Sequence, residues 1–498
     1  MSLRKRTVIQ QALSLRSACM GQRVARGAGL QFMTIGLRTL LTIGSTAVLA
    51  RLLAPSDFGY IAMATVVTEF AALFGAFGFT NVLIQRQRIN RLQLDTVFWA
   101  TLGVGALLSL AVLLLSFVAG WLFADAQVGP VLRVLCWSFM LSSVCAVPTV
   151  VNARLMRFHV DFLVGMGSTV LRIATALLAA WVGLGLWSLV AGTLAGGVFT
   201  ALFSFIAVPY RPRLRFHAPL LTSTWRTSGG YIGNTALYYV NTNLDLLLIG
   251  RGLGATALGY YQNARSLTNE IRGRIAMPIQ HVLFPAFSAL QEERERFQQL
   301  VLRAARLLAA VVIPIGVGVS ANAPELVRVL YGPQWMAMVP VVALFGLSAA
   351  LRASTAISQP LFNANNRVGL ALRYNLLGTL LMVGGVLVGI RFGIQAVALA
   401  VALSSLYSLV MLRTAFRLIG LGMRDMVAAL GSPTLAAMFS WFLTQGLRQL
   451  QWAESPAMLL AGHVLAGGLL YLLALHLLSS QYLQDFRQAT ALMIRKNT

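Results

Sequence analysis

Two ten-residue stretches decide the fold: residues 51–60 read RLLAPSDFGY, and residues 251–260 read RGLGATALGY. They share an Arg, a Leu, a Gly and a Tyr at an offset of 200 residues. Farther along the chain, Pro130 matches Pro340 at an offset of 210, and Arg157 matches Arg367 at the same offset. These matches indicate an internal repeat that covers most of the chain.

The composition predicts that the repeated segments are sets of membrane spans. The chain has 498 residues, of which 58% are hydrophobic and 11% charged, and its mean hydropathy is +0.75. These values exclude an average water-soluble globular protein and predict a membrane protein. A span needs about 20 mostly apolar residues. A window of that length finds fourteen candidates, at 28–50, 58–84, 95–123, 130–152, 161–183, 185–208, 228–250, 255–285, 303–322, 337–361, 368–390, 393–412, 425–447 and 456–478.

We therefore expect an all-α polytopic membrane protein with about fourteen transmembrane helices. Six spans separate the two copies of the repeat, and because six is even, both copies have the same orientation in the membrane. The expected fold is thus two parallel-related six-helix lobes plus two C-terminal helices, as in many secondary transporters. The expected parts are an N-terminal cytoplasmic segment (1–27), an N-lobe (28–208), a cytoplasmic linker (209–227), a C-lobe (228–415), helices 13 and 14 (416–480) and a cytoplasmic tail (481–498).

The charges predict orientation and exclude several functions. The chain has 39 basic and 14 acidic residues, a net charge of +25, and its only lysines are Lys5 and Lys496. A phosphate-binding P-loop and a buried Schiff-base lysine are therefore excluded. Twenty-five basic residues fall on one alternating set of loops and on the termini, and five fall on the opposite loops. This distribution predicts that both termini are cytoplasmic, and it accounts for the basic charge without nucleic acid.

Nine arginines lie within the expected spans beyond the first residue of each span, and each central Arg costs about 2.5 to 3.5 kcal/mol. Beyond the first residue of each span, only three acids lie there: Glu69, Asp245 and Glu270. This excess of Arg predicts a central cationic cavity that suits phosphate, because a guanidinium group binds two phosphate oxygens at once. The candidate substrate-binding residues are Arg38, Arg172, Arg265, Arg272 and Arg352.

Two spans carry matched polar stripes at helical spacing. Thr34, Arg38, Thr42 and Ser45 lie on the first span, and Asn234, Tyr238, Asn241 and Asp245 lie on the seventh. The stripes predict a hydrophilic cleft between the repeats, although ordinary hydrogen bonding between helices is an alternative. For Glu69 and Asp245, two readings stay open: coupling to an ion, or a structural salt bridge. Asn241 is a further candidate for ion coupling.

Enzyme signatures are weak. The five histidines form no pair with metal-ligand spacing, and the sequence contains no G-x-S-x-G motif. We expect no catalytic residue, metal or cofactor, and an H⁺ or Na⁺ gradient is the expected energy source.

Three motifs resemble one known family: ARLLAPSDFG at residues 50–59, DLLLIGR at 245–251 and FPAFS at 284–288. The chain resembles the polysaccharide transporter family of the multidrug/oligosaccharidyl-lipid/polysaccharide exporter superfamily, and within it the Wzx-type flippases of the colanic acid exporter kind. The resemblance implies a V-shaped pair of lobes in the bacterial inner membrane. It also implies that a polyprenyl-pyrophosphate-linked oligosaccharide passes from the cytoplasmic to the periplasmic leaflet by alternating access, with other polysaccharide assembly proteins as further partners.

Two alternatives remain. The first is an ion-coupled exporter of small cationic molecules, which would need an acidic cavity. The second is a membrane polymerase or acyltransferase of the same polysaccharide pathway, which would need exposed acids or a large external loop.

Overall fold

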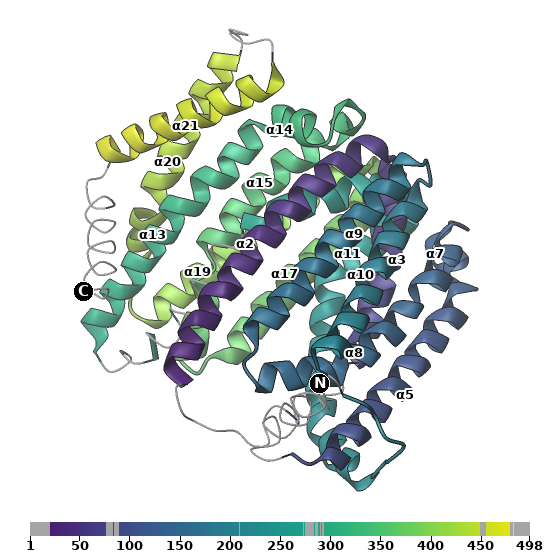
Figure 1. The fold of residues 1–498 in the computed structure, drawn as a ribbon. Coiled ribbons are helices and arrows are strands. Elements are labelled where there is room, and N and C mark those ends of the chain that lie inside the picture. Colours follow the sequence, from purple (N-terminus) through teal and green to yellow (C-terminus); the bar gives the residue numbers. More distant parts are fainter. Residues whose placement is uncertain are drawn as a thin grey trace. The chain divides into compact units, whose positions relative to one another are not determined.

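The structure is a computed structural model. It describes residues 20–75, 83, 89–208, 210–271, 273, 283, 287–288, 290, 293–448, 455–478 and 482, with the side chains of 20–32, 220–234, 237, 270–271 and 448 left out. All regular secondary structure in these residues is helical (Figure 1). The expected all-α fold is confirmed.

The chain divides into two compact units, residues 1–259 and 260–498. The helices of the first unit are α2 (Met20–Leu52), α3 (Pro55–Gly75), α5 (Arg91–Ser116), α6 (Ala119–Phe123), α7 (Val128–Leu135), α8 (Trp137–Arg154), α9 (Phe158–Trp181) and α10 (Leu186–Ala207). Helix α11 (Pro219–Ile271) begins in this unit and continues into the second, and it is broken at Gly254, whose φ is 80°. A positive φ is easy only for glycine, so Gly254 supplies the break.

The second unit contains the later helices: α13 (Arg294–Ala321), α14 (Ala323–Leu330), η2 (Pro333–Met338), α15 (Val339–Ser354), α16 (Ser358–Ala364), α17 (Val368–Gly389), η3 (Ile390–Phe392), α18 (Ile394–Ser404), α19 (Tyr407–Leu418), α20 (Met423–Arg448) and α21 (Pro456–Leu478). Several of them join end to end into one membrane-length element. Helices α18 and α19, for example, together form the candidate span Ile394–Leu418.

Twelve candidate membrane spans lie in the described residues, and they coincide with expected spans one to six and nine to fourteen. Expected spans seven and eight, residues 228–250 and 255–285, fall on α11 and on residues after it that are partly outside the description. The protein is therefore a multi-pass membrane protein, and the total of fourteen spans stays a prediction.

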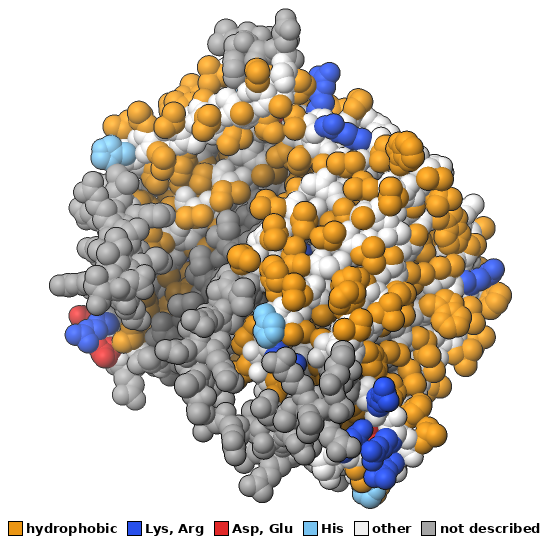
Figure 2. Space-filling model, viewed as in Figure 1, with side chains coloured by type: hydrophobic (Ala, Val, Ile, Leu, Met, Phe, Trp, Pro, Cys, Tyr) orange, Lys and Arg blue, Asp and Glu red, His pale blue; other side chains and the backbone are white. Residues whose placement is uncertain are grey.

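The exposed helix surfaces are apolar, which suits contact with lipid rather than with water. On α5, Leu107, Leu110 and Leu114 lie on one face, and each is more than half exposed. On the described surface that Figure 2 shows, apolar side chains are widespread and charged side chains are few. Water-soluble monomers rarely expose contiguous apolar surface on this scale, so these faces are suited to contact acyl chains.

Both units use the same close helix contact. In the first unit, a Cβ atom added at Gly105 of α5 would collide with Ser143 of α8. In the second unit, a Cβ atom added at Gly316 of α13 would collide with Ala350 of α15. The two contacts are offset by 211 and 207 residues, close to the repeat offset of 210. The packing thus reproduces the sequence repeat.

The two copies of the repeated motif also meet each other inside the first unit. A Cβ atom at Gly59 would collide with the carbonyl oxygen of Ala255, and one at Gly259 would collide with that of Pro55. The two contacts are equivalent under the repeat, because Gly259 is the counterpart of Gly59 and Ala255 is the counterpart of Pro55 at the offset of 200. The first compact unit ends at Gly259, and the lobe boundaries expected from the sequence stay a prediction.

Candidate functional site

The polar stripe of α2 is open at one end and packed at the other. Arg38 is exposed and Thr42 is partly buried, whereas Ser45 and Leu49 are only 9% and 6% exposed. The Thr42 hydroxyl donates to the Arg38 carbonyl (2.7 Å), and the Ser45 hydroxyl donates to the Thr42 carbonyl (2.9 Å). Both hydroxyls thus donate hydrogen bonds within their own helix. The exposed Arg38 side chain is the polar group of the stripe that is placed to bind a ligand.

The matching stripe of α11 has the same gradient. Tyr238 is 59% exposed and Thr242 is exposed, whereas Asp245 and Ile249 are 3% and 0% exposed. The exposed ends of both stripes are the ends that the charge distribution predicts to be cytoplasmic. The two repeats thus have the same pattern of accessibility at equivalent positions.

The structure places Arg172 near Arg38. Helix α2 packs along α9, and the two guanidinium groups are close enough for their charges to repel. Arg172 is partly buried. In the described part of the chain, neither side chain has a hydrogen bond or an ion pair. Holding two like charges together within membrane spans costs free energy, and an anion bound between them would remove that cost.

Close packing of α9 on α10 positions Arg172. A Cβ atom at Gly192 would lie 2.7 Å from the carbonyl oxygen of Arg172, and one at Gly196 would lie 3.2 Å from the Cβ of Arg172. The Ser168 hydroxyl also donates to the Gly196 carbonyl at 2.9 Å. Small residues let membrane helices approach this closely, so α10 supports the backbone that carries Arg172.

Glu69 contacts a tyrosine. The Tyr239 hydroxyl lies 3.3 Å from Oε2 of Glu69 and donates to the carbonyl of Val66 at 3.1 Å. Glu69 itself is exposed, and in the described part of the chain it forms no ion pair. The Tyr239 ring also packs against that of Phe70, with 6.1 Å between centroids. This arrangement holds a carboxylate at an accessible surface of the first unit.

Asp245 differs from Glu69 in being almost fully buried. One of its oxygens, Oδ1, accepts the backbone N–H of Leu246 at 2.9 Å, and the residue makes further polar contacts. Asn241 lies one turn earlier on the same helix and is partly buried. Both are thus placed along the stripe of α11, with Asp245 at its packed end.

The other predicted arginines belong to later parts of the chain. Arg265 lies on the portion of α11 in the second unit and is partly buried, and Arg352 lies in the last turn of α15 and is exposed. Arg272 lies outside the described residues. Within the described residues, no group of three or more His, Cys, Asp or Glu side chains gathers as a metal site would require.

Asp95 is a buried acid that sequence reasoning missed. The expected third span begins at this residue, but α5 begins at Arg91, so Asp95 lies inside the helix and is 0% exposed. Asn90 and Gln93 form a reciprocal cap that sets this earlier start. The motif Asn-x-x-Gln before an apolar run was the signal that could have placed the helix start correctly.

Comparison with known proteins places the chain among polysaccharide biosynthesis proteins, whose family pattern matches residues 48–340, more than half of the chain. The succinoglycan biosynthesis transport protein ExoT of Rhizobium meliloti (strain 1021) is 27% identical over 323 residues, which cover 65% of this chain and 63% of ExoT. The chain thus spans just under two thirds of that relative. The lipopolysaccharide biosynthesis protein WzxC of Escherichia coli (strain K12) is 26% identical over 388 residues, 76% of this chain and 77% of WzxC.

Two solved structures show the same fold. The lipid II flippase MurJ, in an inward closed conformation, matches with a TM-score of 0.70 and 14% identity, covering 89% of this chain and 97% of MurJ. An inward-facing multidrug resistance MATE family transporter of the MOP superfamily matches with a TM-score of 0.57 and 14% identity, covering 77% of this chain and 94% of that one. At these identities the likeness establishes the fold.

Proposed function

Because the chain belongs to the polysaccharide biosynthesis protein family, we propose that it is a flippase for lipid-linked oligosaccharides. It moves a polyprenyl-pyrophosphate-bound repeat unit from the cytoplasmic to the periplasmic leaflet for export of an exopolysaccharide, O-antigen or capsule. The names of ExoT and WzxC, which refer to succinoglycan and lipopolysaccharide biosynthesis, support this class of cargo. The lipid II flippase fold supports a lipid-linked form of it.

The observation that carries the proposal is the pair Arg38 and Arg172. These two cations are close together in membrane spans, and neither is neutralised within the described residues. A pyrophosphate group supplies the compensating negative charge and accepts the paired N–H donors of each guanidinium group. A small cationic drug would be repelled at the same place, which is why the exporter alternative is disfavoured.

Three further arginines belong to the proposed site. Arg265, Arg272 and Arg352 are the candidates on the second half of the repeat, so that both halves contribute cations to substrate binding. The excess of Arg over acid within the expected spans supports this part of the proposal, as does the use of both repeats for substrate binding in transporters of this kind.

The gradient of exposure along the two stripes supports loading from the predicted cytoplasmic side. Arg38 and Tyr238 are accessible, whereas Ser45 and Asp245 are buried. Alternating access exchanges these states, opening the packed end and closing the open one. An H⁺ or Na⁺ gradient drives the exchange through Glu69, Asp245 and Asn241, of which Glu69 is the accessible carboxylate.

The protein resides in the bacterial inner membrane with both termini in the cytoplasm. The division of loop charges into 25 and five supports this orientation. Alkylation of single introduced cysteines by a membrane-impermeant reagent tests it in intact cells. Labelling of either terminus from outside would overturn the orientation.

A transport assay tests the proposed function. Purified protein is reconstituted into liposomes with a fluorescent polyprenyl-pyrophosphate glycan, and a membrane-impermeant quencher reports the fraction in the outer leaflet. We expect transfer between leaflets that leaves the glycan chemically unchanged. Covalent change of the glycan without transfer would indicate the polymerase or acyltransferase alternative, and transport of small organic cations in place of the glycan would indicate the exporter.

A further inference from the structure

A short segment between α10 and α11 is fastened to the start of α5. We name residues 210–217, whose sequence is YRPRLRFH, the basic strap. The Tyr210 hydroxyl donates to Oδ1 of Asp95 at 2.6 Å, and the Arg213 backbone N–H donates to the same oxygen at 3.3 Å. The Tyr210 ring packs on Phe98, with 5.9 Å between centroids. One fully buried carboxylate thus holds two points of the strap.

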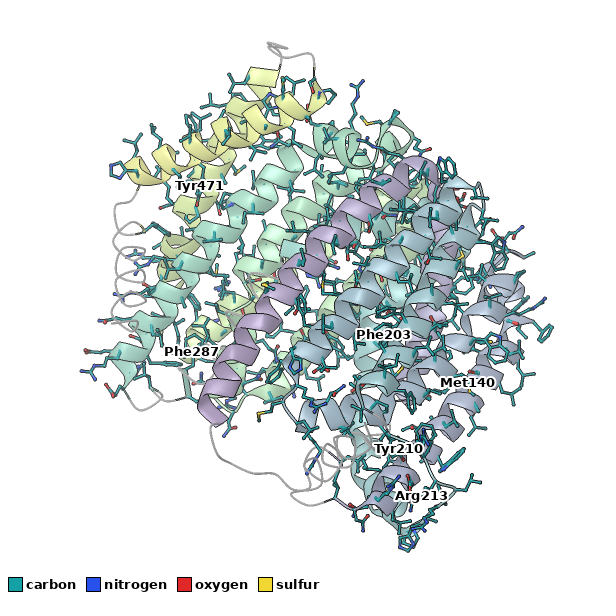
Figure 3. All side chains as sticks on the ribbon, viewed as in Figure 1. Met140, Phe203, Tyr210, Arg213, Phe287 and Tyr471 are labelled. Atoms are coloured by element: carbon teal, nitrogen blue, oxygen red, sulfur yellow. The ribbon has the colours of Figure 1, made fainter. Side chains whose placement is uncertain are left out.

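Two more hydrogen bonds extend this attachment. The indole N–H of Trp99 donates to the Arg213 carbonyl at 2.8 Å, and the backbone N–H of His217 donates to the Thr96 hydroxyl at 3.2 Å. Arg213 is thus held through both its backbone N–H and its carbonyl, while the residue is exposed. Figure 3 places Tyr210 and Arg213 at the same end of the first unit.

On the exposed surface of the basic strap, charged side chains alternate with large apolar side chains. Arg211, Arg213 and Arg215 are exposed, and in the described part of the chain their side chains form no ion pair or hydrogen bond. Leu214 is 88% exposed and Phe216 is 57% exposed. The strap contains no acid, and Asp95 is buried beneath it. Figure 2 shows blue side chains gathered at the end of the molecule where Figure 3 labels Arg213.

The position of the strap brings this surface to the level of lipid headgroups. Helix α10, a candidate membrane span, ends at Ala207, four residues before Arg211. Leu and Phe at such a level enter the boundary between headgroups and acyl chains, and Arg remains among the headgroup phosphates. Exposed apolar bulk of this kind would be unfavourable if the strap projected into water.

We propose that the basic strap is a binding site for the headgroups of anionic phospholipids in the leaflet that the charge distribution predicts to be cytoplasmic. The three guanidinium groups bind the phosphates, and Leu214 and Phe216 insert beside them. The hydrogen bonds to α5 hold the backbone in place before the lipid arrives, so little ordering entropy is lost on binding. The site shares no residue with the proposed cargo site at Arg38 and Arg172, so its test does not require the cargo.

Fluorescence quenching tests the proposal on the full chain. Leu214→Cys is labelled with a fluorophore in a Cys19→Ser background, because the remaining cysteines, Cys136 and Cys145, are buried. The protein is reconstituted into phosphatidylcholine vesicles containing a minor fraction of phosphatidylglycerol. Bromine is placed on the acyl chains of one lipid or the other, in equal amount. We expect stronger quenching by brominated phosphatidylglycerol, because each contributing Arg raises the preference of the site for the anionic lipid by about fivefold at low salt. The preference should be smaller at high salt.

Two triple variants decide the outcome. Arg211, Arg213 and Arg215 are replaced together by Gln, and the matched control replaces the exposed Arg413, Arg417 and Arg424 by Gln, which removes the same charge elsewhere. The strap variant should quench equally with both lipids, and the control should keep the wild-type preference. Equal quenching by both lipids in the parent protein would overturn the proposal, as would a preference that survives in the strap variant. Absence of quenching by either lipid would place the strap against water or a protein and would overturn it as well.

Discussion

Gly59 of α3 packs directly against the backbone carbonyl of Ala255, and no Cβ atom fits between the two segments. The equivalent contact joins Gly259 to Pro55. The two copies of the repeated motif thus contact each other reciprocally. This contact explains why both copies have glycine at this position. Each glycine lets one copy approach the main chain of the other.

Replacing either glycine should therefore weaken the fold. In Gly59→Ala and Gly259→Ala, the added methyl group meets backbone, which cannot rotate away as a side chain can. We expect each variant to lose about 1 to 3 kcal/mol of stability, seen as a lower melting temperature in detergent. Gly44→Ala is the matched control, because the added Cβ has no atom within 4 Å apart from its chain neighbours and the backbone of its own helix. Unchanged melting of the Gly59 and Gly259 variants would contradict the close contact.

Removing either cation of the proposed site should impair transport. In Arg38→Gln and Arg172→Gln, we expect the rate of glycan transfer between leaflets to fall by about tenfold to a hundredfold, since a hydrogen bond to a charged group contributes about 1.5 to 3 kcal/mol. Arg38→Lys keeps the charge but loses the paired donors, so it should recover only part of the rate.

Arg133→Gln is the control for that series. Arg133 also lies in a candidate span, but its guanidinium group stacks on the Phe117 ring, 4.8 Å from the centroid. Its loss should leave the transfer rate near that of the wild type. Full activity in both Arg38→Gln and Arg172→Gln would refute the assignment of the site.

Glu69 and Tyr239 provide a test of ion coupling. If Glu69 carries the coupled proton, Glu69→Gln should abolish the stimulation of transport by an imposed proton gradient, because the amide does not titrate. Tyr239→Phe keeps the carboxylate and removes the hydroxyl that lies 3.3 Å from it, so coupling should persist. Stimulation that is unchanged in Glu69→Gln would assign coupling to other residues.

The anchor of the basic strap should weaken in alkali. Burial and the adjacent Asp95 raise the pKa of Tyr210 above its usual range. Below about pH 10, the usual tyrosine pKa, the hydroxyl is protonated in both folded and unfolded chains, so its hydrogen bond contributes fully. At higher pH the unfolded chain releases the proton while the folded chain retains it, and this difference destabilises the folded state.

Melting curves of wild type and Tyr210→Phe check this effect. At neutral pH the variant should be less stable by about 1.5 to 3 kcal/mol, since it loses a hydrogen bond to a carboxylate. The gap between the two melting temperatures should shrink as the pH rises above about 10. A gap that stays constant would mean that the Tyr210 hydroxyl contributes nothing to the anchor.

The sequence by itself determined the membrane class, the positions of most spans and the repeat. These are properties of contiguous residues: a run such as 186–207 is apolar throughout and long enough to cross a bilayer, whatever it packs against. The excess of Arg over acid within spans was equally visible, because composition needs no contacts. On that basis Arg38 and Arg172 were predicted as cations of the site, each on its own.

Tertiary structure alone decided which residues meet. Arg38 and Arg172 are 134 positions apart in the chain, and their proximity depends on how closely Gly192 and Gly196 let α10 approach α9 and on the packing of α2 along α9. The bond between Tyr239 and Glu69, the burial of Asp95 under the basic strap and the contact between the two repeated motifs depend in the same way on packing. Hydropathy is summed along a segment, whereas a contact requires two segments distant in the chain to adopt one particular distance and rotation.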